Sequence, residues 1–150
     1  MAETRQSLLN QIHRARAAHK RWLAHVTALA QGLSLDQSKA ELDPNACDFG
    51  RWYTGTGHTD LGHLPSFAAM DDPHRRAHIY YAEIVQALEA RRPRDVPRRL
   101  RWLRAASEEL IGLLAALEDE ARAMPMEQNG HGNLGRQPSE QGPSGSDSSA

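Results

Sequence analysis

Three histidines of this 150-residue chain stand in apolar helical stripes, at positions where leucine is the usual residue. With steps of three and four residues, one stripe comprises Leu8, Ile12, Ala15, His19, Trp22, Val26, Leu29 and Leu33, and a second comprises His74, His78, Tyr81, Val85 and Leu88. An imidazole that faces a helical core loses its hydration and needs a partner for each ring nitrogen. A shared metal ion would supply that partner to all three histidines.

The single cysteine, Cys47, lies between these two stripes in the sequence. Three imidazoles and one thiolate form the nitrogen and sulfur ligand set that tetrahedral zinc favours. His74 and His78 are four residues apart, so their rings project from one helical face, as two ligands of a single ion must. The pattern predicts one metal ion per chain, held by His19, Cys47, His74 and His78. The ligand types favour zinc, with nickel, cobalt or copper as alternatives for the same set.

Each part of this pattern also has an ordinary interpretation. A histidine in an apolar stripe is more often a hydrogen-bonded core residue than a ligand, and a lone cysteine is usually a small buried hydrophobe. A histidine pair with a spacing of four also occurs on solvated helix faces. It is the combination of two inward-facing stripes with the sole cysteine that favours a metal site.

Three aromatic residues close to these ligands in sequence are candidates for sealing a metal from water, namely Trp22, Phe49 and Trp52. Ordinary core packing explains them equally well, because both interpretations require burial. The other histidines are not needed as ligands. His13 and His25 fall off the first stripe and His131 lies in a polar tail, so solvated positions are expected, whereas a loop is expected to carry His58 and His63.

Periodicity and turn residues place the helices. Long helices are expected over roughly residues 3–33, 73–91 and from about residue 96 to residue 124, with a short helix within 43–53 that carries Cys47. The Gly-Thr-Gly run at 55–57 predicts a stop, and residues 65–70 can add one helical turn. Asp71 and Asp72 before Pro73, and Asp95 before the last helix, are candidate capping residues.

The composition limits the class of protein. We expect residues 1–124 to form one domain, and residues 125–150, rich in Gly, Ser and Pro, to form a disordered tail. A net charge of −1 gives no reason to expect a nucleic-acid partner. One cysteine excludes an internal disulfide framework, and charged residues recur through the N-terminal region, so neither a secretory signal nor a membrane span is expected. These features predict a cytoplasmic protein.

The motifs resemble those of a known family. His19-x-x-Trp22, Cys47-x-Phe-Gly-x-Trp-Tyr53 and His74-x-x-x-His78 are similar, in order and interval, to the motifs of the chemoreceptor zinc-binding (CZB) domain. The resemblance covers roughly residues 5–122 and implies an antiparallel helical bundle, a homodimer and a zinc site with the same four ligands. We therefore expect an all-α fold, an antiparallel four-helix bundle with a short additional helix carrying the cysteine.

Seven arginines crowd the connection before the last helix and the start of that helix: Arg91, Arg92, Arg94, Arg98, Arg99, Arg101 and Arg104. Positive charge at a helix N-terminus opposes the helix dipole and is therefore locally unfavourable. An interaction with a partner would compensate for this, so Arg98, Arg99 and Arg101 are candidates for a partner surface. A plain solvated arginine face is the alternative. The broad apolar face of the last helix, which adds Trp102, Ala106 and Leu113, agrees with a dimer or with a monomeric four-helix core.

Three classes of function are weighed for such a site, namely hydrolysis, a structural or storage role for zinc, and sensing. A hydrolase needs an open metal position and a carboxylate base, but four protein ligands close the site and no acid stands between His74 and His78. A structural zinc would clamp the helices, and a zinc buffer would only hold the ion. A sensor would respond to zinc, or to oxidants that attack the zinc-bound thiolate. We expect a sensor without enzymatic activity, because the resemblance implies control of chemoreceptors or diguanylate cyclases. As a stand-alone chain, this sensor would act on a separate signalling partner.

Overall fold

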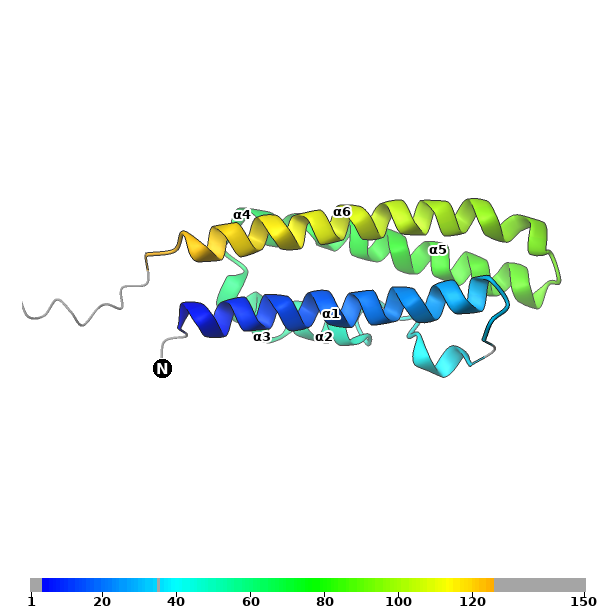
Figure 1. Cartoon of the computed structure of the whole chain (residues 1–150), viewed down its shortest axis with the longest axis horizontal. Coiled ribbons are helices and arrows are strands. Elements are labelled where there is room, and N and C mark those ends of the chain that lie inside the picture. The colour runs from blue at the N-terminus through cyan, green and yellow to red at the C-terminus, as the bar shows by residue number, and fades with distance from the viewer. Residues whose placement is uncertain (1–3, 35, 126–150) are drawn as a thin grey trace, which may run out of the picture.

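The computed structural model describes residues 4–34 and 36–125, and every regular element in this range is helical (Figure 1). The elements are α1 (Arg5–Ala30), the 3₁₀ turn η1 (Gln37–Lys39), α2 (Asp48–Thr54), α3 (Thr56–Leu61), α4 (Pro65–Ala69), α5 (Asp71–Glu89), the 3₁₀ turn η2 (Pro93–Asp95) and α6 (Val96–Arg122). The all-α prediction is confirmed. Three of these helices are long, so the more specific four-helix arrangement stays a prediction.

The long helices α1, α5 and α6 run alongside one another, and the short helices α2 and α3 lie against α1 (Figure 1). The apolar stripes of the sequence face inward, except at Leu33, which lies beyond the end of α1 and is 78% exposed. On α6 the fully buried leucines recur at steps of seven, four and three residues, namely Leu103, Leu110, Leu114 and Leu117. Burying one such side chain contributes roughly 1.5–3 kcal/mol, so this stripe is the main reason why α6 packs in one orientation. This packing fixes the long helices relative to one another, and so it also fixes the side chains on them that could bind a metal.

Two long helices end in the same way. After α1, Gly32 has a φ of +75°, and after α5, Arg91 has a φ of +56°. In each case the following residue donates its N–H to a carbonyl five residues earlier, from Leu33 to Ala28 and from Arg92 to Ala87. This is the Schellman arrangement, in which a left-handed residue closes the helix. The expected end of the first helix near Gly32 agrees with this geometry.

The segment after residue 54 differs from expectation. The prediction of a loop with His58 was wrong, because Gly55 only separates α2 from a second short helix, α3. Gly57 lies against the indole of Trp52, where a Cβ would come within 2.7 Å of the ring. The Gly-Thr-Gly run therefore permits a close approach between two helices.

The predicted caps also differ. Met70 alone separates α4 from α5, and Asp71 and Asp72 lie in the first turn of α5, where their charge favours the positive end of the helix dipole. Asp95 precedes α6, but its side chain makes no capping hydrogen bond. The predicted capping acid was therefore wrong at α5, whereas Asp95 does occupy the N-terminal cap position of α6, as predicted, without a capping hydrogen bond from its side chain.

The predicted tail falls almost wholly on residues 126–150, which lie outside the described residues together with His131, and so it stays a prediction. Within residues 4–34 and 36–125, no helix is long and apolar enough to cross a membrane.

Candidate metal centre

Cys47 is placed by a tight turn that leads into α2. Its backbone N–H bonds to the carbonyl of Asp43, and Cys47 is the N-terminal capping residue of α2. The Gly50 N–H donates to Cys47 Sγ over 3.2 Å, and the thiol donates to the Pro44 carbonyl over 3.5 Å. The sulfur thus replaces the oxygen of an ordinary capping side chain and is aimed toward α5.

His74 and His78 project from the first turns of α5 toward this sulfur. His74 Nε2 lies 3.3 Å from Cys47 Sγ, and the ligand atoms of Cys47, His74 and His78 all lie within 4.8 Å of one another. All three residues are buried. Two atoms bound to one zinc at about 2.0–2.3 Å lie about 3.5 Å apart, so the sulfur–nitrogen distance suits a shared ion.

The hydrogen bond of His78 fixes its tautomer. Its Nδ1 lies 2.9 Å from the Leu42 carbonyl, which can only accept, so Nδ1 carries the proton. Nε2 of His78 is buried and has no hydrogen-bond partner among the described residues. A buried ring nitrogen without a partner costs free energy unless something binds its lone pair. His78 belongs to the three-residue cluster, and the unmet lone pair of its Nε2 is what a metal cation would satisfy.

His19 approaches the cluster from α1 but stands slightly apart. It is 1% exposed, and its ring centroid is 6.4 Å from that of His74. Its Nε2 lies 3.1 Å from Ser107 Oγ of α6. The cluster of three therefore has the fourth predicted ligand beside it, held by a contact that the sequence did not reveal.

Burial keeps these groups uncharged. It lowers the pKa of His19 to about 4, helped by His78, and the pKa of His74 to about 3, helped by His78 and His19. Burial also lowers the pKa of His78, although its bond to the Leu42 carbonyl opposes this. Burial raises the pKa of the Cys47 thiol, and the Gly50 N–H opposes that shift. Neutral imidazoles are ready to bind a cation, whereas the thiol must lose its proton to do so.

Aromatic rings enclose the cluster. Trp22 lies over His78 with 4.4 Å between ring centroids and donates its indole N–H to the Glu41 carbonyl. Phe49 packs on His74 at 4.6 Å. Trp52 is one layer farther out: it packs on Phe49 and donates to Gln11. Of the three predicted aromatic residues, Trp22 and Phe49 contact histidine rings of the site.

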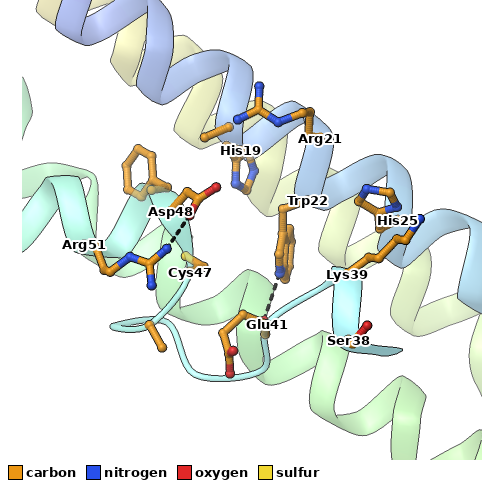
Figure 2. A pocket seen from close by; sticks show the side chains of 13 residues that line it. His19, Arg21, Trp22, His25, Ser38, Lys39, Glu41, Cys47, Asp48 and Arg51 are labelled. Atoms are coloured by element: carbon orange, nitrogen blue, oxygen red, sulfur yellow. Dashed lines mark hydrogen bonds and ion pairs between the residues drawn. The ribbon is translucent and has the colours of Figure 1, made fainter. Parts of the chain in front are cut away.

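A pocket of about 380 Å³ leads to the site from one side (Figure 2). His19 and Trp22 of α1 project into it from above in that view, and Cys47 lies below them at the start of α2. Its polar residues include Arg21, His25 and Lys39. Cys47 and His19 therefore have a path to solvent although both are buried.

The other candidate residues lie elsewhere. His13 is exposed and contacts Glu118, His25 is half-buried in the pocket wall, and His58 and His63 are exposed. None of these four belongs to the Cys47 cluster.

The three candidate arginines at the start of α6 differ among themselves. Arg99 is bound to Glu83 and to the Asp95 carbonyl. Arg101 has no ion pair among the described residues, and Arg98 has none but lies over the Trp102 ring at 5.9 Å.

Three features of the site were missed in the sequence. The Leu42 carbonyl gives no signal, because any residue has one. Ser107 does give one, since it is a polar residue in the otherwise apolar stripe of α6. Gln11, which links Trp52 to Asp60, was also missed.

The comparisons with known proteins agree with this geometry. Residues 19–85 match the family model of the chemoreceptor zinc-binding domain, and no curated protein or solved structure matched the chain. The family is a regulatory zinc-binding one and not a catalytic one. The matched range contains Cys47, His74, His78 and the adjacent His19, a nitrogen and sulfur set that fits zinc. Over residues 19–85 this chain is thus similar to the chemoreceptor zinc-binding (CZB) domain family.

Proposed function

We propose that this protein is a zinc-dependent regulatory domain with one zinc ion per chain, bound by His19, Cys47, His74 and His78. The observation that carries the proposal is the buried Nε2 of His78, which has no hydrogen-bond partner among the described residues, on a residue whose ligand atom lies within 4.8 Å of those of Cys47 and His74. A purely structural histidine network would satisfy that nitrogen.

The test is the zinc content of reduced, untagged protein, compared with His78→Ala and with His63→Ala as a matched control. His63 is exposed and outside the cluster, so its loss should leave the zinc content at about one per chain. His78→Ala should lose most of the metal. A parent protein that binds no zinc, or a His78→Ala variant that binds as much as the parent, would contradict the proposal.

We propose that the domain responds to zinc itself or to an oxidant that reaches the Cys47 thiolate. The pocket beside Cys47 and His19 supports this, because a sealed structural site would have no such path. A peroxide would oxidise the thiolate to sulfenic acid and be reduced to hydroxide, and the neutral sulfenic acid would hold zinc less well. Peroxide should therefore release zinc from the parent protein, with sulfenic acid detected at Cys47. Release without modification of Cys47 would contradict this route.

A structural zinc clamp is the second candidate, and one observation favours it. In the connection from residue 31 to residue 46, Ala40 is the only buried residue among those described. A metal at Cys47 would hold down this poorly packed segment. Circular dichroism of metal-free protein separates the two roles: retained helix content favours regulation, whereas global unfolding favours the clamp.

The chain is proposed to act as a homodimer in the cytoplasm, on a separate signalling protein, without enzymatic activity of its own. Trp102 on α6 is 43% exposed, and Arg98 and Arg101 nearby have no ion pair within the part of the chain that the structure describes, which supports a partner surface there. Light scattering should give about twice the chain mass of 16.7 kDa.

The proposed contact residues are Arg98 and Arg101. Arg99, the third arginine expected at this surface, is already bound to Glu83. Changing both to Glu should abolish the effect on the partner's activity and leave the zinc content unchanged. An unchanged effect would remove this surface from the proposal.

A further inference from the structure

Ser107 is a buried hydroxyl in the apolar stripe of α6. It is 1% exposed, and its neighbours in the stripe, Leu103 and Leu110, are fully buried. A hydroxyl at such a position costs free energy unless it is hydrogen-bonded. Among the described residues, the one hydrogen-bond partner of its hydroxyl is His19 Nε2, 3.1 Å away and 88 residues earlier in the chain. The pairing connects α6 directly to a proposed zinc ligand.

This contact can decide which nitrogen of His19 is offered to the metal. The ring is neutral, so it carries one proton. When Nε2–H donates to Ser107 Oγ, the lone pair stands on Nδ1, and Nδ1 is then the nitrogen able to bind a cation. When the serine donates instead, Nδ1 carries the proton and cannot bind. A metal therefore selects the form in which the serine oxygen accepts.

The tautomer of His78 is fixed in the same way, but the two ring nitrogens exchange roles. Its Nδ1–H donates to the Leu42 carbonyl and leaves Nε2 as the ligand atom. Histidines that bind metals almost always donate their other N–H in this way, which fixes both tautomer and ring orientation. His78 is held by the connection between α1 and α2, and His19 is held by α6.

We propose that Ser107 is a positioning residue of the zinc site: its Oγ accepts the Nε2–H of His19 and so presents Nδ1 to the metal. The inference rests on the proposed role of His19 as a ligand. It also concerns a residue outside the family-model match, because α6 lies beyond residues 19–85. Zinc binding and the position of α6 are then linked through one hydrogen bond.

The test compares the zinc affinities of the parent, Ser107→Ala, Ser107→Thr and Ser66→Ala in competition with a chromophoric chelator. Ser66 is the matched control, because it is also buried and its hydroxyl bonds to Glu120, away from the site. Ser107→Ala should bind zinc about 10- to 100-fold more weakly, the usual effect of losing such a partner. Ser107→Thr keeps the hydroxyl and should recover most of the affinity, whereas Ser66→Ala should bind like the parent.

A second measurement does not depend on affinity. Nitrogen-15 chemical shifts of the zinc-loaded parent should show His19 protonated at Nε2 and His78 protonated at Nδ1. In Ser107→Ala the Nε2–H signal of His19 should weaken or exchange faster with water. These spectra also report whether the variant is folded.

The outcomes separate this inference from the proposed function. A parent without zinc would overturn both. A parent that binds zinc normally, with Ser107→Ala of equal affinity or with His19 protonated at Nδ1, would overturn the role of Ser107 alone. An equal loss of affinity in Ser66→Ala would also overturn it, because the effect would then be one of general stability.

Discussion

The Cα of Gly50 faces the backbone carbonyl of Pro44 so closely that an added Cβ would lie 1.7 Å from that oxygen. This contact packs the first turn of α2 against the turn that holds Cys47, whose sulfur accepts the Gly50 N–H. The close approach of two backbone segments, and not an unusual φ, is why glycine is needed here.

Gly50→Ala should therefore destabilise the protein by more than about 2 kcal/mol and weaken zinc binding, because the turn around Cys47 must move. The matched control is Gly112→Ala on α6, where nothing lies within 4 Å of the added Cβ. That change should stabilise by about 0.5–1 kcal/mol, since alanine favours a helix interior. Urea unfolding and zinc titration measure both effects. Equal behaviour of the two variants would contradict this account of Gly50.

Acid should destabilise the metal-free protein through its buried histidines. His19, with a pKa of about 4, and His74, with a pKa of about 3, stay neutral in the folded state, whereas unfolded histidines take up a proton near pH 6.5. The unfolded state then binds more protons, so the free energy of unfolding falls as pH drops from about 6.5 toward 4, by up to about 1.4 kcal/mol per pH unit for each histidine.

Urea unfolding of metal-free protein at pH 7, 6 and 5 measures this slope. The variant His74→Gln should show a shallower slope, whereas the exposed His63→Ala should keep that of the parent. A free energy of unfolding that is constant from pH 7 to 5 would show that the folded state accommodates protonated histidines.

Glu118 should hold α1 against α6. Hydrogen bonds from Arg16, His13 and Arg122 lower the pKa of its carboxyl to about 2. Because the folded-state pKa is depressed, this stabilisation is present above pH 4.5 and is lost as pH falls from about 4.5 to 2. Glu118→Gln should cost about 1 kcal/mol at pH 7.

The control for Glu118 is Glu108→Gln on the same helix, since Glu108 is exposed and forms no ion pair among the described residues. Its unfolding midpoint in urea should match that of the parent. A Glu118→Gln variant as stable as the parent at pH 7 would show that its ion pairs contribute nothing net, as is common at surfaces.

The two left-handed helix ends should respond in opposite directions to exchange of their residues. Arg91 bears the steric cost of a positive φ, whereas Gly32 does not. Arg91→Gly should raise the free energy of unfolding by about 0.5–1 kcal/mol, and Gly32→Ala should lower it by about 1 kcal/mol. Thermal unfolding compares the pair. A destabilised Arg91→Gly would mean that the arginine side chain makes up for its backbone strain.

The sequence predicted the features that depend on the helical period, namely which side chains face the core. The positions of His19, His74 and His78 in their stripes indicated three inward-facing rings, and all three are buried. What it did not predict depends on contacts between distant segments. The role of Gly57 follows from the place of the Trp52 ring, and the role of Ser107 follows from a histidine on another helix. A polar residue in an apolar stripe marked Ser107 as unusual, but only the packing of α1 against α6 identifies its partner.

Cys47 lies 27 residues before His74 in the chain, and it follows His19 by a similar interval. A metal bound by these residues would act as a cross-link that closes two loops of comparable length. A covalent link across such a loop lowers the entropy of the unfolded chain by an amount equivalent to about 3–4 kcal/mol. Loss of the metal would therefore restore the freedom of the exposed connection before Cys47 more than that of the leucine-packed helices, and a protease should cut there first.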